Sequence, residues 1–73
     1  MNFIFRKKNR YHVIKITDQN DGIRYGIASE TDPNIFVLDI STDRKFVAQL
    51  NRKCNKGNLS PLHLVDVVED ELP

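Results

Sequence analysis

The chain has 73 residues, which limits it to one small domain and excludes a multidomain enzyme. Apolar residues make up 40% of the sequence and charged residues 29%, with 11 basic against 10 acidic side chains, a balance that does not favour charge-driven disorder. The single cysteine, Cys54, cannot form a disulfide within the chain. No apolar run approaches the roughly 18 residues of a membrane span, so we expect a globular domain without a membrane segment.

The first ten residues join a short apolar run, Phe3–Phe5, to the basic run that follows it. Export signals have the opposite order and a longer apolar segment. Together with the one free cysteine, this order favours a cytoplasmic protein. Residues 2–5 could add an edge strand to a sheet, or residues 1–10 could be a tail, and the pattern leaves both open.

Three segments have the composition of β-strands. Tyr11–Thr17 is dominated by β-branched and aromatic residues, and Ile23–Ser29 alternates between apolar and other residues. Asp21 and Gly22 between them form a tight-turn signal, so the two segments should pair as a hairpin. Ile35–Ile40 is an apolar run between turn residues and predicts a third strand that is central or well covered.

The first predicted helix follows Ser41, which has the position of an N-cap, and places Thr42 and Asp43 in its first turn. Gly57 near its end is available for a left-handed C-cap. The apolar residues of this segment recur at the spacing of one helix face, and they are Phe46, Val47, Leu50 and Cys54.

The second predicted helix runs from Pro61 to about Glu71, with Ser60 as its N-cap and Leu59 packed onto Leu64. Apolar residues lie on two of its faces, and a helix of this kind needs cover on two sides.

Strands followed by helices predict an α+β fold. We expect one domain over residues 1–73, in which a small antiparallel sheet of three strands, or four with residues 2–5, carries a two-helix hairpin on one face. The predicted core residues are Val13, Ile14, Ile16, Tyr25, Ile27, Phe36, Leu38, Phe46, Val47, Leu50, Leu64, Val67 and Val68.

Three segments resemble a family of small uncharacterised proteins from Gram-positive, clostridium-like bacteria. They are Tyr25-Gly26-Ile27, Asp39-Ile40-Ser41 and, as the specific part, the run from Leu59 to Asp70. The resemblance covers roughly Tyr25 to Leu72 and leaves out the basic N-terminal stretch. It implies a small cytoplasmic bacterial protein and supplies no activity, cofactor or catalytic residue.

The second predicted helix also carries the favoured candidate for a functional surface. It combines a second apolar face with acidic side chains, as in a helix that packs into a groove. They are Leu62, Val65, Asp66, Glu69, Asp70 and Leu72. We therefore expect a non-enzymatic protein-interaction or regulatory module, with a protein partner or a second copy of the chain as its target.

Two basic blocks, residues 6–15 and 44–56, favour an alternative function in nucleic-acid binding. The candidate contacts are Arg6, Lys7, Lys8, Arg10, Arg44, Lys45, Arg52 and Lys53. The sequence pI of 7.9 is lower than the value above about 9 expected of a dedicated nucleic-acid binder. Solubility alone accounts for surface charges of both signs, so nucleic acid is the weaker alternative.

His63, Asp66 and Asp70 share one helix face and could bind a divalent metal with help from His12 or Asp39. A solvated helix face explains the same residues better, because charged side chains are mostly exposed. Cys54 could pair with His63 or His12 as a nucleophile, but its position on an apolar helix face is typical of an inert, buried thiol. We therefore expect no catalytic residue, no metal and no cofactor.

Overall fold

The structure, a computed structural model, describes residues 9–20 and 22–72. The sequence leaves open whether residues 2–5 form a fourth strand or belong to a tail, and these residues lie outside the described part of the chain. So do the basic residues Arg6, Lys7 and Lys8.

Three antiparallel strands form the sheet in the order β1-β2-β3. β1 (Tyr11–Thr17) and β2 (Ile23–Ser29) have the predicted bounds, while β3 (Phe36–Ser41) begins and ends one residue later than expected. The central strand is β2, so the expectation of a central or well-covered third strand was wrong. β3 lies at an edge because the chain connects successive strands directly, each one pairing with its neighbour.

Side-chain oxygens hold both strand connections in place. After β1, the Asp18 carboxylate accepts hydrogen bonds from the backbone N–H groups of Asn20 and Gly22. After β2, the buried Ser29 hydroxyl accepts from the N–H groups of Thr31 and Asp32. Short polar side chains close turns in this way, which explains their concentration between the strands.

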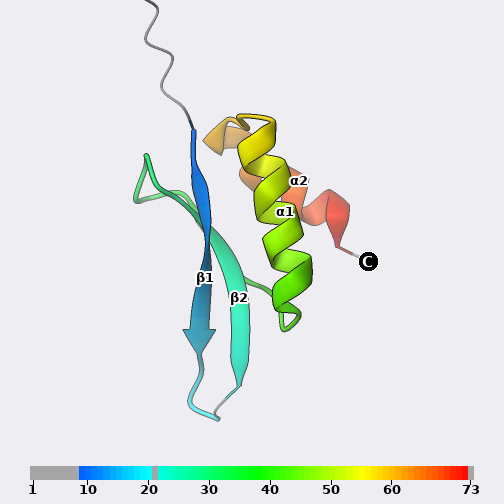
Figure 1. The fold of residues 1–73 in the computed structure, drawn as a ribbon. Helices are drawn as coiled ribbons and strands as arrows, with labels where there is room; N and C mark the ends of the chain where they lie inside the picture. Colours follow the sequence, from blue (N-terminus) through cyan, green and yellow to red (C-terminus); the bar gives the residue numbers. More distant parts are fainter. Residues whose placement is uncertain (1–8, 21, 73) are drawn as a thin grey trace, which may run out of the picture.

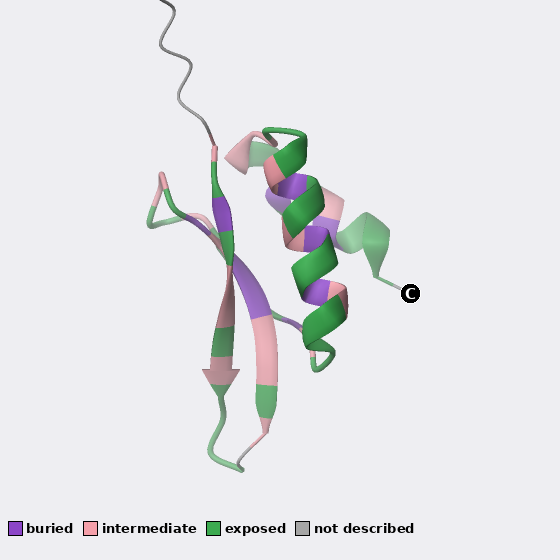
Figure 2. Cartoon of the chain, viewed as in Figure 1, coloured by how far each residue is buried: buried purple, intermediate pink, exposed green. Residues whose placement is uncertain are grey.

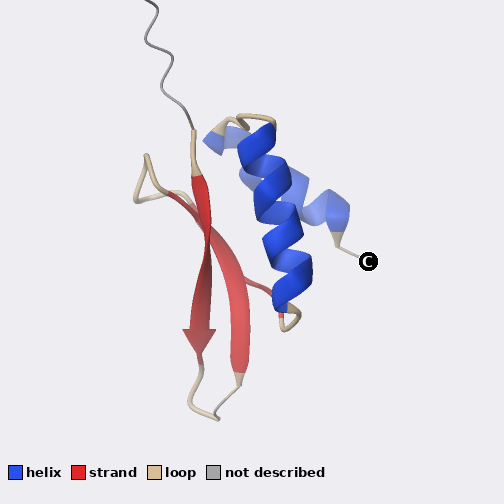
Figure 3. Cartoon of the chain, viewed as in Figure 1, coloured by secondary structure: helices blue, strands red, loops and turns tan. Residues whose placement is uncertain are grey.

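Both helices pack on the same face of the sheet, as predicted (Figures 1 and 3). α1 (Arg44–Lys56) contacts all three strands, and α2 (Leu64–Glu71) contacts β3 and α1. One turn of 3-10 helix, η1 (Pro61–His63), leads into α2, so the predicted second helix begins as a tighter turn. The α+β prediction is thereby confirmed.

The helix ends differ from the predicted ones. Asp43, and not Ser41, is the N-cap of α1, because its carboxylate accepts from the N–H groups of Lys45 and Phe46. Gly57 has a right-handed conformation, and the left-handed residue is Asn58, with φ of 49°. Ser60 precedes η1 without a side-chain capping bond.

The core lies between the helices and the sheet (Figure 2). Its buried apolar residues are Tyr11, Ile27, Ile40, Val47, Leu50, Cys54, Leu64 and Val68. Phe46, Val13, Tyr25 and Val67 are half-buried against it, as expected for members of the predicted core. Ile14 and Ile16 are half-buried but are absent from this cluster.

Two core predictions in β3 were wrong. Phe36 and Leu38 are 49% and 48% exposed, and Ile40 is buried instead. The reason is a β-bulge: Ile27 pairs with Val37 and Tyr25 with Ser41, so three residues of β3 lie opposite Gly26 alone. Asp39 in the bulge has a φ of 59°, and the irregularity shifts the alternation of side chains along the strand.

The bulge requires a glycine in β2. A Cβ atom at Gly26 would overlap the Val37 carbonyl oxygen, because the backbone of β3 passes directly against this residue. Gly26 therefore allows the close approach of two backbones.

The start of β1 is joined to the end of α1 by one asparagine side chain. The Asn55 carbonyl oxygen accepts from the Tyr11 N–H at 2.7 Å, and the Asn55 amide nitrogen donates to the Tyr11 C=O at 2.9 Å. Asn55 thus satisfies both backbone groups of an edge-strand residue, as a neighbouring strand would. The Tyr11 hydroxyl also donates to the Leu59 carbonyl, which fixes the segment between the helices.

Candidate protein-interaction surface

The outer face of α2 and η1 is the surface that the sequence predicts for a partner, and we call it the α2 surface. Leu62 is 83% exposed and Val65 51%, so both large aliphatic side chains are available on this surface. Asp66, Glu69 and Asp70 are exposed on the same helix. Leu72, 39% exposed, lies at the end of the helix.

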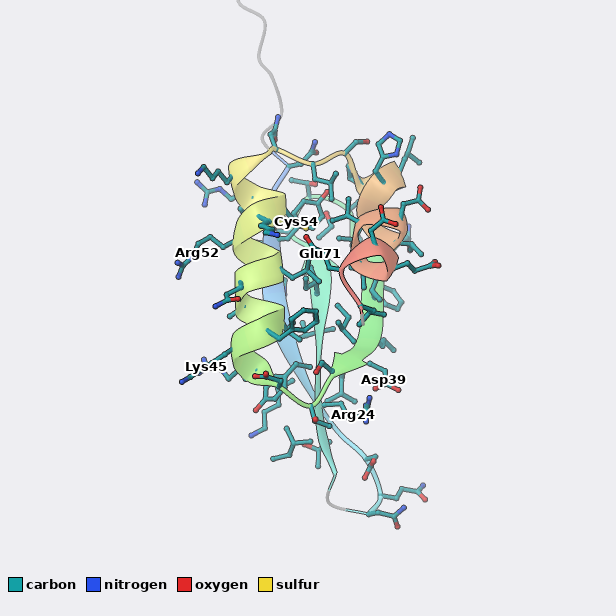
Figure 4. The ribbon with its side chains drawn as sticks, turned by 90° about the vertical axis from the view of Figure 1, so that its right-hand side faces the viewer. Arg24, Asp39, Lys45, Arg52, Cys54 and Glu71 are labelled. Atoms are coloured by element: carbon teal, nitrogen blue, oxygen red, sulfur yellow. The ribbon has the colours of Figure 1, made fainter. Side chains whose placement is uncertain are left out.

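Buried contacts on the opposite side of α2 hold this surface outward. Leu64 is fully buried and Val68 is 2% exposed, so these two residues fix the rotation of the helix against the core. At its last turn, Glu71 accepts a hydrogen bond from Lys53 of α1 at 2.7 Å. Figure 4 shows Glu71 turned toward α1. The exposed apolar residues are therefore presented on a helix whose orientation is already determined.

The second basic block lies on α1. Arg44, Lys45 and Arg52 are all exposed, and the helix has no acidic residue. Figure 4 shows Lys45 and Arg52 pointing away from the core on the same side of α1. Lys53 differs from them because it pairs with Glu71. Arg10 is exposed just before β1, so the structure describes only part of the first block.

The alternatives with metal or thiol chemistry find no support in this geometry. Among residues 9–20 and 22–72, no group of three or more His, Cys, Asp or Glu side chains is arranged to hold a metal ion. Cys54 is buried, and burial raises the pKa of its thiol, which is the opposite of what a reactive thiolate requires. His12 pairs with Ala28 in the sheet and lies on the face away from the helices, so it does not meet Cys54.

A broad open pocket of about 670 Å³ lies between the start of α1 and the end of α2. Its apolar lining includes Phe46 and Leu72, and its charged lining includes Arg24 and Glu71. Arg24 already forms an ion pair with Asp39 (Figure 4). The charges of the pocket have mixed sign, so it favours no single class of small ligand.

Residues 4–72 match a family described as a family of unknown function (DUF6514). The chain belongs to the DUF6514 family. No curated protein and no solved structure shows a significant match to this chain. The match begins at residue 4, so the family region includes the basic residues Arg6–Lys8, which the resemblance in the sequence left out.

The sequence resemblance pointed to an uncharacterised family, and the family match confirms that part of it. The DUF6514 match spans every element from β1 to α2, so the whole described fold belongs to the family region. In the described part of the chain, no helix has the length and apolarity that crossing a bilayer requires.

Sequence reasoning missed a second apolar surface, half-buried in part and exposed at Phe36 and Leu38, on the face of the sheet away from the helices. We call it the open sheet face and define it by Ile14, Ile16, Ala28, Phe36 and Leu38. Adjacent apolar residues such as Val13 and Ile14 point to opposite faces of a strand. Apolar residues on both faces are typical of a strand that is covered on both sides, and this pattern in β1 could have predicted the second surface.

Proposed function

We propose that this member of the DUF6514 family is a non-enzymatic protein-interaction or regulatory module that binds through its α2 surface. One observation carries the proposal: Leu62 of η1 and Val65 of α2 are exposed, while Leu64 and Val68 of α2 are buried against the core. A helix that needs only its inner face for the fold keeps its outer apolar residues free for a partner.

The charges on this surface define the partner. Asp66, Glu69 and Asp70 are exposed beside the apolar pair. A complementary site is an apolar groove with lysine or arginine residues along its rim, so that Leu62 and Val65 enter the groove and the carboxylates meet the rim. Burying a leucine or valine side chain contributes about 1.5–3 kcal/mol, so we expect this pair to provide the main apolar contribution to binding.

The proposal includes a cytoplasmic location and an origin in Gram-positive bacteria. The unpaired, buried Cys54 suits a reducing compartment. The run from Leu59 to Asp70, which carries the resemblance to proteins of those bacteria, is also the segment that forms η1 and most of α2.

The test is affinity capture from a nuclease-treated lysate of a clostridium-like bacterium, with wild-type protein and the double variant Leu62→Ser, Val65→Ser. Both side chains are exposed, so the variant should fold, which circular dichroism checks. We expect a specific protein band with the wild type that the variant loses. Gln49→Ser, an exposed change on α1, is the matched control and should keep the band. A band of equal strength with the double variant would contradict the proposal.

Nucleic-acid binding is the second candidate, favoured by the exposed cations of α1. Arg44, Lys45 and Arg52 lie on a helix without acids, where phosphates would meet no repulsion. Fluorescence anisotropy of a labelled DNA or RNA oligomer tests it at low salt. Binding that weakens steeply with added salt, and more so in the triple glutamine variant of these residues, would support this candidate. An unchanged anisotropy at low salt would exclude it.

A further inference from the structure

The outer edge of β1 is a row of backbone groups that the described fold pairs only in part. β1 has β2 on one side and no strand of the described sheet on the other. Just before β1, the Arg10 C=O accepts a hydrogen bond from the Glu30 N–H, and just after it, the Asp18 N–H donates back across the hairpin. Because backbone groups along a strand point alternately to either side, the even-numbered residues bond to β2 and the odd-numbered ones point outward. The outward residues of β1 are Tyr11, Val13, Lys15 and Thr17.

Asn55 of α1 fills only the first of these outward positions. Its amide group bonds both the N–H and the C=O of Tyr11, at 2.7 and 2.9 Å. Within residues 9–20 and 22–72, no backbone hydrogen bond reaches the outward groups of Val13, Lys15 and Thr17. These residues keep three N–H donors and three C=O acceptors for an added strand, and an edge of this kind is a template for one.

α1 carries a second unpaired polar group along the same edge. The helix runs antiparallel to β1 and packs against it, with Asn55 beside Tyr11 (Figure 1). Four helix residues rise about 6 Å and two strand residues span about 6.6 Å, so Asn51 lies level with Val13 and on the same helix face as Asn55. The Asn51 side-chain oxygen is buried and has no hydrogen-bond partner among the described residues. The acceptor is therefore in place one step further along the edge, and its donor is missing.

We propose that the edge of β1 from Val13 to Thr17 binds an extended, acidic segment of a partner protein as a fourth strand of the sheet. Backbone hydrogen bonds to β1 supply the attachment, as in other complexes formed by strand addition. A donor on the incoming segment bonds the Asn51 oxygen. This inference does not rest on the α2 surface, which belongs to the other end of the helix layer and stays free.

Charge identifies the segment as acidic. Neither β1 nor α1 contains an acidic residue, and Lys15 is exposed on the helix side of β1, the side to which Val13 points. Arg44 and Arg52 are exposed on α1, which packs over the same strand (Figure 4). Carboxylates at alternate positions of the added strand point to this side and meet these cations. A second copy that paired β1 with β1 would bring two sets of cations together, so charge opposes that occupant.

Amide hydrogen exchange of the full wild-type chain tests whether the edge is open. The N–H groups of Ile14 and Ile16 bond to β2, so they should exchange slowly. Those of Val13, Lys15 and Thr17 should exchange faster, because they point outward. Equally slow exchange of both sets would show that the edge is already covered in the protein alone, by another part of the chain or by a second copy, and would overturn the proposal.

Titration of the isotope-labelled chain with short peptides, followed by nuclear magnetic resonance, tests the occupant. The probe alternates glutamate and valine, so that all carboxylates lie on one side of the extended peptide. We expect it to shift the amide signals of Val13, Lys15 and Thr17 and to slow their exchange. A peptide of alternating lysine and valine should bind far less, and so should the acidic peptide with N-methylated glutamates, which cannot donate to β1. Equal binding of either control, or no binding of the acidic peptide, would contradict the proposal.

Variants of the chain locate the binding with the same acidic peptide. Asn51→Ala should weaken it about twofold to tenfold, the range for one lost hydrogen bond. Lys15→Glu should weaken it further and improve binding of the lysine peptide, whereas Lys56→Glu, the same charge change at the exposed end of α1, should have little effect. The α2 variant Leu62→Ser, Val65→Ser should bind as the wild type does. Loss of binding in this last variant would place the peptide on the α2 surface, which would overturn the edge proposal and leave the proposed function standing.

Discussion

At the scale of single residues, the most informative side chain is Asn55. It lies near the end of α1 and satisfies both backbone groups of Tyr11, at 2.7 and 2.9 Å. One helix turn earlier, the buried Asn51 side-chain oxygen has no hydrogen-bond partner among the described residues. These two asparagines therefore form a matched pair for measuring what the contact contributes.

We expect Asn55→Ala to lower the free energy of unfolding by about 1–3 kcal/mol, because it leaves the Tyr11 N–H and C=O without protein partners. Asn51→Ala changes the same residue type in the same helix and removes no side-chain hydrogen bond seen within the described residues, so its effect should be near zero or stabilising. Urea unfolding of both variants measures the difference. Equal losses in the two variants would show that the Asn55 contact contributes nothing specific.

Two buried ionisable groups, the Tyr11 phenol and the Cys54 thiol, determine how the free energy of unfolding should depend on pH. Burial raises the pKa of the Tyr11 phenol, with the nearby Cys54 adding to the rise, and burial also raises the pKa of the Cys54 thiol. Both groups therefore stay protonated in the folded state at pH values where the unfolded chain loses its protons. Their contribution is fully present below the unfolded pKa values, which are about 8.5 and 10, and is lost as the pH rises through the folded values.

Urea midpoints measured from pH 7 to about pH 11 should accordingly decline above about pH 9. Cys54→Ala removes one of the two groups and should make the decline shallower, whatever its effect on stability at neutral pH. Parallel pH profiles for the wild type and this variant would contradict the assignment of Cys54 to the buried, protonated state.

At the scale of elements, the β3 bulge decides which side chains enter the core. The sequence predicts β1 and β2 with the observed bounds, because their composition and turn signals are local properties. The burial of Ile40 in place of Leu38 could not be predicted in the same way. It depends on Asp39 adopting a positive φ and on Gly26 in another strand.

Gly26→Ala should be the most damaging single methyl addition in the sheet. The new Cβ atom meets the Val37 carbonyl oxygen, which is backbone and cannot rotate away, so we expect a loss of at least about 2 kcal/mol. Ala28→Ser on the same strand and the same face should cost less than about 1 kcal/mol. Thermal unfolding followed by circular dichroism compares the two variants. An equally stable Gly26→Ala protein would mean that β3 does not pass against this residue.

The start of α1 also depends on structure beyond the local sequence. Ser41, Thr42 and Asp43 are successive capping candidates, and the local pattern favours the first of them. The structure uses Asp43, because Ser41 is still part of β3 and its hydroxyl accepts from the Asp43 N–H. Leu62 and Val65, both in the predicted second helix, are exposed as expected, since helical periodicity is enough to separate the faces of this segment.

At the scale of the whole molecule, the fold exposes apolar residues on opposite sides. Helices cover one face of the sheet, the open sheet face lies behind it, and the α2 surface faces outward from the helix layer (Figures 1 and 2). A chain of 73 residues buries a limited share of its surface, and partners that cover these two sites would add to its stability. The exposed cations of α1 and the acidic residues of α2 give the same domain two helices of opposite charge.

The central claim is that Leu62 and Val65 bind a protein partner, and calorimetric titration of the captured, purified partner tests it most directly. We predict that Leu62→Ser with Val65→Ser weakens binding by at least about tenfold, because each side chain loses part of an apolar burial worth about 1.5–3 kcal/mol. The exposed control Gln49→Ser should bind as the wild type does. Equal affinities for the wild type and the double variant would contradict the claim and leave the exposed apolar pair without a function.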